Sequence, residues 1–406
     1  MNLLKPLFIF YLIANGLGFS VFVARGTVVS WYVLEETNST LLVGIITSIP
    51  TMTLPILGPF GGRLADSFSK EKVFFYARIT IFVVMILMAF FINLNFYSII
   101  FLIIFSVLFG LTSSVENAST QNLLIDIVGI ENISRGNGFK ELFNSSLNAI
   151  LPVTIGLFLT ILSSSLIFWA LPIIASFALL FGYLTFINFK PVKGVKNIDQ
   201  DFTEVTVRDG INYVKKNKNI YTLLLIGFGM MVFWAFSQPL LPLYSKDVLN
   251  IGGSGYAILN GLYFFGSMIG SLLITFSIVK IKKSRILFIS ALMFSIFHIL
   301  LYNSNDSILS GILIVASGVS HSIWWVSILV YLQTISDEKY KGRVVGFYFS
   351  LLVSVSIGSI LGGLISEFIG IKPTVYLAMA CLMAIHSVAF MSSKLRKLNL
   401  LEKESY

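Results

Sequence analysis

The chain has 406 residues, of which 56% are hydrophobic and 12% are charged. Soluble domains carry about 25% charged residues, so this composition excludes an ordinary water-soluble globular protein. The formal net charge of +9 would suggest a nucleic-acid partner for a soluble protein, whereas in a membrane protein it follows from where Lys and Arg lie along the chain.

Hydrophobic stretches long enough to cross a bilayer recur along the whole chain and predict a polytopic all-α membrane protein. We expect the first stretch to be a retained helix, because it is too long for the apolar core of a signal peptide. In chain order, the twelve predicted spans are 7–34, 40–65, 72–92, 97–126, 137–162, 166–189, 220–245, 254–279, 286–302, 307–335, 344–369 and 373–393.

An even number of spans places both termini on one side of the membrane. If that side is the cytoplasm, 25 of the 28 Lys and Arg residues lie on cytoplasmic segments, as the positive-inside rule requires. The asymmetry therefore predicts cytoplasmic termini, and it accounts for the basic charge without a nucleic-acid partner.

The long polar stretch near the middle of the chain divides the spans six and six. We predict a six-helix bundle over 1–189, a cytoplasmic linker over 190–219, a second six-helix bundle over 220–394 and a cytoplasmic tail over 395–406. The segments ISRGNGFKELF and KGRVVGFYFS stand at equivalent places before the fifth and eleventh spans. Two six-span repeats are typical of alternating-access transporters.

One segment of the linker has the pattern of an amphipathic helix. Val207, Ile211 and Val214 fall on a single helical stripe that is flanked by bases. This pattern predicts a helix that lies on the cytoplasmic membrane surface and contacts lipids. A plain tether between the two bundles fits the same residues equally well.

The segment GRLADSFSKEK, Gly62 to Lys72, lies between the second and third spans on the cytoplasmic side. It resembles the loop-two motif of the major facilitator superfamily, small-x-Leu-small-Asp-basic-x-Gly-basic-basic. The residues that match are Gly62, Leu64, Ala65, Asp66 and Lys70, whereas Lys72 lies one position beyond the second base and Ser67 and Ser69 replace the usual base and Gly. The resemblance implies two six-helix bundles that rock around a central cavity.

We expect this segment to form part of a gate at the cytoplasmic end, where Asp66 accepts hydrogen bonds from a helix start or pairs with an Arg. The glycines let helices approach closely. An ordinary charged turn is the alternative. The residues expected in the gate are Gly58, Gly62, Asp66, Lys70, Lys72, Asp126, Arg135, Glu141 and Arg343.

Two further segments resemble the macrolide-efflux and enterobactin-exporter branch of that superfamily. They are Glu116 to Phe139, at the junction of spans four and five, and KGRVVGFYFS, at the junction of spans ten and eleven. The stretch LPVTIG resembles a degenerate form of the Gly-Pro motif of drug/proton antiporters, in which Pro152 and Gly156 are kept. With Gly358 and Gly362, these two residues are expected to serve helix packing.

Ionisable residues inside spans are costly and are functional hypotheses by default. Arg25 in span one is expected to hold an anionic group of the cargo. Glu116 in span four is expected to carry a coupling proton, because a buried carboxyl binds protons more readily than an exposed one. Their depths differ by about 15 Å along the helices, so we expect no direct pair between them. A structural ion pair, or an Arg that snorkels outward, is the alternative.

In the superfamily fold, spans one, four, seven and ten line the cavity. The aromatic and polar residues on or near these spans suit a bulky amphipathic cargo. The expected cargo-site residues are Asn15, Asn144, Asn148, Trp234, Gln238, His321 and Trp324. The three Asn residues fit helix–helix hydrogen bonds equally well, and a lone helical His is more often a packing residue than a proton relay.

The sequence contains no nucleotide-binding loop, no nucleophile elbow and no cluster with metal-ligand spacing. We therefore predict neither an enzyme nor a primary pump, and no cofactor or metal. The prediction is a monomeric secondary transporter of a prokaryotic inner membrane. It exports a drug-like or siderophore-like amphipathic small molecule in exchange for protons. A proton-coupled importer or uniporter of a sugar or metabolite is the alternative.

Overall fold

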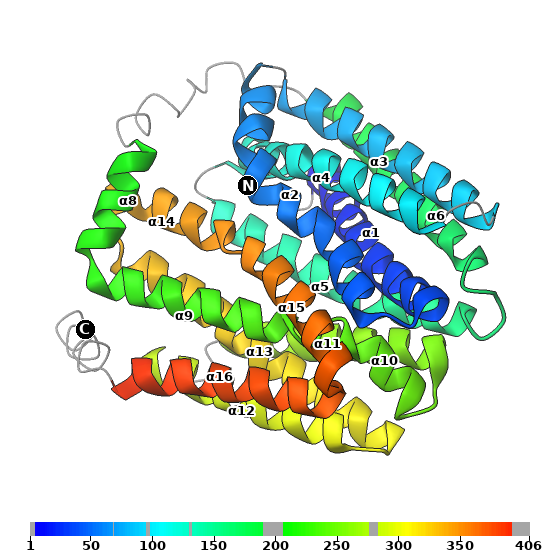
Figure 1. The fold of residues 1–406 in the computed structure, drawn as a ribbon. Coiled ribbons are helices and arrows are strands. Elements are labelled where there is room, and N and C mark those ends of the chain that lie inside the picture. The colour runs from blue at the N-terminus through cyan, green and yellow to red at the C-terminus, as the bar shows by residue number, and fades with distance from the viewer. Residues whose placement is uncertain are drawn as a thin grey trace.

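The computed structural model describes residues 5–67, 69–94, 98–129, 132–189, 206–275 and 283–391. The side chains of residues 54–67 and of a few other positions are outside this description. Every regular element in these ranges is a helix, and no strand is found among them (Figure 1). The predicted all-α class is therefore confirmed.

The first half of the chain forms a bundle of long helices, in the upper part of Figure 1. It begins with a proline at the first turn of α1, where a missing N–H costs nothing. The α1 helix ends at Asn38, which has a left-handed φ of 51° and donates its N–H to the Leu34 carbonyl. The elements are α1 (Pro6–Thr37), α2 (Thr40–Ser67), α3 (Lys70–Asn93), α4 (Ser98–Val128), α5 (Ile133–Phe158), η2 (Leu166–Trp169) and α6 (Ala170–Asn188).

The second half forms a matching bundle in the lower part of Figure 1. Two of its predicted spans are broken helices. Pro239 lacks a backbone donor and separates α9 from α10, and a turn at Leu351 and Leu352 separates α14 from α15. The elements are α9 (Lys218–Ala235), α10 (Leu240–Asp247), α11 (Gly252–Thr275), α12 (Lys283–Asn303), α13 (Ser307–Ile335), α14 (Glu338–Ser350), α15 (Val353–Ile369) and α16 (Ile371–Met391).

Ten helical segments in the described ranges are long and apolar enough to cross a membrane. The segments at the other two predicted spans, α2 and α5, form helices of 28 and 26 residues. The α5 helix carries Lys140, Glu141 and several Asn and Ser residues, which lower its apolar character. The protein is thus a multi-pass membrane protein, and the full count of twelve spans remains a prediction.

The two halves meet along two helix pairs, α2 with α15 and α5 with α11. Small residues allow this close approach. A Cβ added at Gly156 of α5 would lie 2.8 Å from the Ser254 carbonyl oxygen of α11. A Cβ at Gly363 of α15 would overlap the Thr40 carbonyl oxygen of α2. The backbones therefore touch across both seams.

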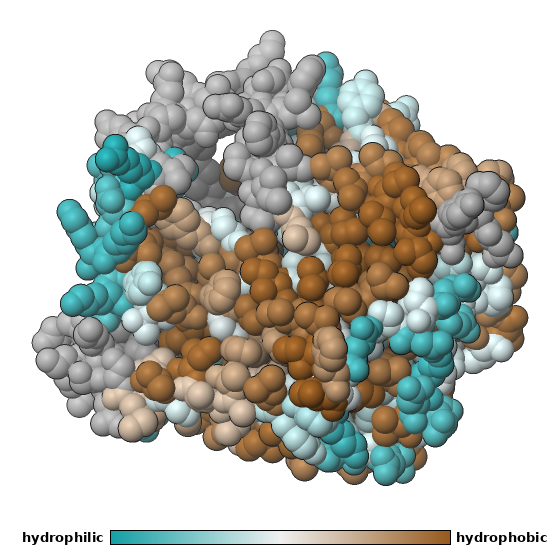
Figure 2. Space-filling view, viewed as in Figure 1, coloured by the Kyte–Doolittle hydropathy of each residue, from teal (hydrophilic) through white to brown (hydrophobic). Residues whose placement is uncertain are grey.

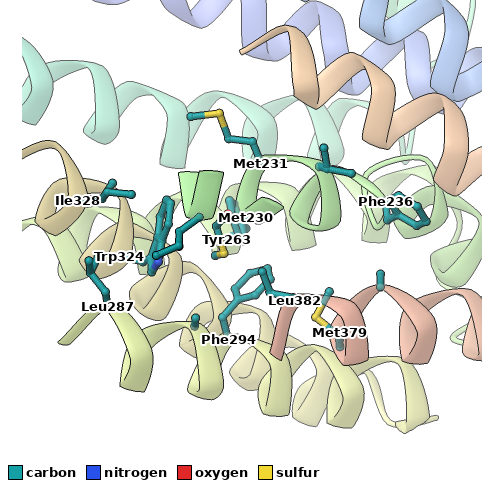
Figure 3. Packing of buried hydrophobic residues seen from close by; sticks show 14 of the residues in the cluster. Met230, Met231, Phe236, Tyr263, Leu287, Phe294, Trp324, Ile328, Met379 and Leu382 are labelled. Carbon is teal, nitrogen blue, oxygen red and sulfur yellow. The ribbon is translucent and has the colours of Figure 1, made fainter. Parts of the chain in front are cut away.

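Each half has a main hydrophobic core, and that of the first half also includes Tyr256 and Ala257 of α11. In the second half, Phe294, Trp324 and Leu382 are fully or almost fully buried and pack between α12, α13 and α16 (Figure 3). Many large apolar side chains lie on the outside, where brown patches cover much of the surface in Figure 2. Such a surface suits contact with lipid rather than water.

The described part of the linker forms α8 (Val207–Lys216). Thr206 and Asp209 make a reciprocal capping box at its start. The Tyr213 ring stacks on Tyr340 of α14 at 4.2 Å between centroids, and its hydroxyl accepts from the Asp337 N–H at 3.0 Å. The helix therefore docks on the second half. The rest of the predicted linker, residues 190–205, and the tail from residue 395 lie outside the described residues.

Candidate functional site

A buried ion pair lies inside the first half, between α3 and α4. Arg78 Nη2 lies 2.5 Å from Glu116 Oε1, and the exposed fractions of the two side chains are 2% and 12%. The guanidinium group lies over the Phe74 ring at 5.0 Å. Arg78 was not among the predicted site residues. It was counted with the cytoplasmic Lys and Arg residues, whereas the structure buries it within α3, and its place inside the apolar span 72–92 was the signal for this.

Two glycines frame the Arg78 side chain. A Cβ added at Gly18 of α1 would overlap its Nη1, whereas one added at Gly182 of α6 would lie 3.4 Å from its Cγ in ordinary contact. Glu116 is the acid found opposite this cation, and Nε and Nη1 of Arg78 have no hydrogen-bond partner among the described residues. The glycine at position 18 therefore makes the space that the ion pair needs.

Arg25 is a second buried cation, on α1, and its side chain is 1% exposed. Its Nη2 donates to Ser106 Oγ of α4, and its guanidinium lies over the Phe109 ring at 5.4 Å. No carboxylate pairs with it in the described part of the chain. Arg25 and Glu116 thus have different partners, in line with the depth difference expected between them.

Of the three predicted Asn residues, Asn15 lies on α1, and Asn144 and Asn148 lie on α5. Asn148 accepts from Ser20 Oγ at 3.1 Å, which joins the two helices. The side-chain oxygens of Asn15 and Asn144 are buried without a donor among the described residues. One of the three therefore serves helix packing, and the other two retain an unused polar atom.

Aromatic side chains of four helices surround His321 in the second half. Its ring stacks on Trp234 of α9 at 4.9 Å between centroids. Tyr263 of α11 lies at 6.0 Å and Trp325 of α13 at 6.2 Å, and Trp325 lies 5.3 Å from the Tyr348 ring of α14. Trp325 and the two tyrosines were not predicted as site residues.

Trp324 turns away from this group. It is fully buried and donates its indole N–H to His386 Nε2 at 3.0 Å, so that it belongs to the core of the second half. His386 Nδ1 lies 2.9 Å from the Leu382 carbonyl oxygen, which makes His386 a neutral packing histidine with its proton on Nδ1. Gln238 is exposed at the break between α9 and α10.

The predicted gate residues form local pairs where their side chains are described. Lys70 of α3 lies 3.3 Å from Asp126 of α4, and both belong to the first half. Lys140 lies 3.8 Å from its neighbour Glu141. The surroundings of Gly58, Gly62 and Asp66 fall outside the description. Lys72 and Arg135 are exposed, and Arg343 lies beside Gly210 of α8.

The predicted packing residues lie at helix contacts. Pro152 lies inside α5, on which Gly156 meets α11. Cβ atoms added at Gly358 and Gly362 of α15 would overlap the carbonyl oxygens of Val232 and Phe236, at the end of α9. These two glycines therefore bring helices together within the second half.

A group of polar contacts that we did not predict joins the halves at one end, here named the closed end. Glu367 of α15 accepts from the Leu41 N–H of α2 at 3.1 Å and from Ser39 Oγ at 2.5 Å. Thr40 Oγ1 donates to the Gly363 carbonyl at 3.0 Å. Lys246 Nζ lies 2.5 Å from Asn38 Oδ1. Two further contacts join α1 and α11, an Asn260–Thr27 hydrogen bond and a Trp31–Tyr256 ring stack.

Comparison with known proteins adds two findings. The family model of the Major Facilitator Superfamily matches residues 8–352 and 223–399. The chain is 25% identical over 390 residues to macrolide efflux protein A of Streptococcus pyogenes, which covers 91% of this chain and 92% of that protein.

Solved structures resemble the fold. The nucleoside transporter NupG has a TM-score of 0.76 and 12% identity over 96% of this chain and 99% of its own. The inward-open xylose transporter XylE from E. coli has a TM-score of 0.71 and 14% identity over 95% and 96% of the two chains.

Proposed function

Because the chain belongs to the major facilitator superfamily, we propose that it exports a drug-like or siderophore-like amphipathic small molecule in exchange for protons. It works as a secondary transporter, by alternating access, in the inner membrane of a prokaryotic cell. A macrolide is the first cargo to test. Export is favoured by one observation above all, the similarity to macrolide efflux protein A along nine-tenths of both chains.

The arrangement of the halves supports alternating access. Polar contacts join α2 and α15 at the closed end, around Glu367 and Thr40, and continue along the helices to Ser356. The positive-inside rule assigns this end to the outer face of the membrane. The protein would then be sealed on the outside and take up cargo from the cytoplasm. Breaking these few contacts would let the halves rock and release the cargo outside.

The Arg78–Glu116 pair supports proton coupling. Glu116 keeps a small exposed fraction, whereas Arg78 is enclosed, so a proton arriving from the cavity would reach the carboxylate first. Protonation of Glu116 would leave the Arg78 cation buried without an anionic partner, which is costly. The resulting strain would favour a different helix arrangement. Proton binding and conformation would thereby be linked.

Proton-driven transport in everted vesicles tests the proposal. Vesicles with an acidic lumen should accumulate a radiolabelled macrolide, and an ionophore that collapses the pH gradient should abolish accumulation. Vesicles with Glu116→Gln should still bind the macrolide and fail to accumulate it against a gradient. The exposed Glu35 of α1 provides a matched control, and Glu35→Gln should transport normally.

Import of a sugar or metabolite is the second candidate, since the solved structures with this fold include nucleoside and xylose transporters. Uptake by right-side-out vesicles without accumulation by everted ones would overturn export. Accumulation that survives the ionophore and the Glu116→Gln change would overturn proton coupling alone. The protein should purify as a monomer in either case.

A further inference from the structure

The aromatic group around His321 contains polar atoms that bond to nothing in the described part of the chain. We name Trp234, Tyr263, His321, Trp325 and Tyr348 the aromatic subsite. The indole N–H of Trp234 and the hydroxyls of Tyr263 and Tyr348 are buried and have no hydrogen-bond partner among the described residues. The Tyr263 and Tyr348 side chains belong to residues that are 8% and 0% exposed.

Three such donors within one group of touching rings are unusual. Almost all buried polar groups in native proteins have a partner, because leaving one unpaired costs its hydration without return. Two other buried tyrosines among the described residues follow the rule. The Tyr244 hydroxyl contacts the Leu301 and Ser304 carbonyls and Ser310 Oγ, and the Tyr302 hydroxyl donates to the Ser237 carbonyl at 3.1 Å.

The positions of the donors bring two of them together. The Tyr263 hydroxyl of α11 and the Trp234 indole N–H of α9 are close enough to interact, but neither group has a hydrogen bond of regular geometry among the described residues. Both rings contact His321. His321, Trp234 and Trp325 are partly exposed, so the rings form a wall that is reached from outside the core. The donor atoms themselves are buried, so a cargo oxygen would accept from both of them once the rings move apart.

We propose that the aromatic subsite binds a neutral, oxygen-rich part of the cargo, such as a group of carbonyl, ether or hydroxyl oxygens on an apolar ring. The inference rests on the proposed transport function and specifies the chemistry of its cargo. Donors without acceptors select oxygen acceptors, and flat rings select apolar faces. The described residues of the subsite carry no acid, so it offers a cationic group no ion pair, and its unpaired donors favour oxygen acceptors instead.

Removing single hydroxyl groups tests the subsite. Tyr263→Phe and Tyr348→Phe keep the ring and delete the unpaired hydroxyl, whereas Tyr244→Phe deletes a hydroxyl with three partners and is the matched control. The affinity of the purified protein for a radiolabelled macrolide should fall about 3- to 10-fold for Tyr263→Phe, the range of one neutral hydrogen bond. Tyr244→Phe should keep the affinity within about 2-fold.

The thermal stability of cargo-free protein is an independent readout. Tyr263→Phe and Tyr348→Phe should leave Tm unchanged or raise it, because the deleted hydroxyl has no partner. Tyr244→Phe should lower Tm. A fall of Tm for Tyr263→Phe as large as that for Tyr244→Phe would mean that a structural water holds the hydroxyl, and the subsite would be refuted. Unchanged macrolide affinity in both Tyr263→Phe and Tyr348→Phe would also refute the proposed subsite.

Failure of the proposed transport function would give results different from failure of the subsite. If wild-type protein neither binds nor accumulates the macrolide, the macrolide is not the cargo. The Tm readout still decides whether the hydroxyls are unpaired. The affinity comparison is then made with the oxygen-rich amphiphile that gives the largest Tm increase in a panel of such compounds. A panel in which only cationic amphiphiles raise Tm would overturn the assignment of the subsite.

Discussion

Arg78 Nη2 and Glu116 Oε1 form an ion pair 2.5 Å long in the interior of the first half. The pair joins two neighbouring helices at a depth where water is scarce, and Arg78 has unpaired nitrogens on its other side. A buried pair of this kind adds little net stability, because desolvation of both ions offsets their attraction. The loss of one partner, by contrast, leaves a buried charge without compensation.

Single and double neutralisation of this pair should therefore differ. Glu116→Gln or Arg78→Gln alone should lower the free energy of unfolding by about 3 kcal/mol or more, since each leaves one ion unpaired. The double variant should recover much of that loss. Thermal unfolding of the purified proteins in detergent measures the difference. A double variant that is as unstable as the sum of the two single variants would show that the ions do not interact.

Gly18, which lies against the Arg78 guanidinium, should not tolerate an added methyl group. Gly18→Ala would place its Cβ on the guanidinium and should lower the free energy of unfolding by about 2 kcal/mol through overpacking. Gly182→Ala adds only an ordinary contact to the same side chain. It should be neutral or stabilising, because Ala favours helix by about 1 kcal/mol over Gly. Equal Tm values for Gly18→Ala and Gly182→Ala would show that the Arg78 side chain does not need the space left at Gly18.

The hydrophobic runs were sufficient to predict most helices. The predicted spans 7–34 and 72–92 correspond to α1 and α3, which begin and end within about three residues of those bounds. The breaks in the seventh and eleventh spans were missed. The residues next to each break are mostly apolar, so a window of mean hydropathy does not detect the interruption.

Partners across helices could not be predicted, because they depend on the rotation of each helix about its axis. Trp324 and Trp325 are neighbours in sequence, about 100° apart around α13. A span that is apolar on all sides does not reveal which of them faces the core. Trp324 bonds His386 inside the core, and Trp325 joins the aromatic subsite. For the same reason, the pairing of Glu116 with Arg78 could not be predicted.

The start of α8 should depend on pH only in strong acid. Hydrogen bonds from the Thr206 side chain and backbone hold the pKa of Asp209 below its usual range. A carboxyl with a lowered folded pKa stabilises the helix above its unfolded pKa of about 3.9, and this stabilisation is lost as the pH falls through the folded value. Protection of α8 amides from hydrogen exchange should therefore be constant from about pH 5 to 8.

Asp209→Asn should weaken this protection at neutral pH. The change removes the charged acceptor of the capping box and leaves the Tyr213–Tyr340 stack intact. Hydrogen exchange monitored by mass spectrometry measures the peptide that contains α8. Exposed Asp247, at the last residue of α10, serves as the control site, and Asp247→Asn should leave α8 unchanged. Identical exchange in Asp209→Asn and wild type would show that docking on α14, rather than the cap, holds this helix.

The closed end should open when Glu367 is altered. Its carboxylate accepts from the Leu41 N–H and from the Ser39 hydroxyl at the start of α2, so that a residue of one half caps a helix of the other. A helix N-terminus favours a negative charge by about 0.3–1 kcal/mol. Glu367→Gln should therefore shift the conformational equilibrium about 2- to 5-fold toward separation at this end.

Spin labels measure that shift directly. Cysteines introduced at Asn38 and Lys246, after replacement of the single native Cys381, report the separation between the halves at the closed end. Because these labels remove the Lys246–Asn38 contact in every variant, the comparison isolates Glu367. Glu367→Gln should increase the population with long distances, and Glu35→Gln, which removes an exposed charge at the same end of α1, should not. Equal distance distributions for the two variants would mean that the close backbone packing of Gly363 on Thr40, and not the carboxylate, keeps this end shut.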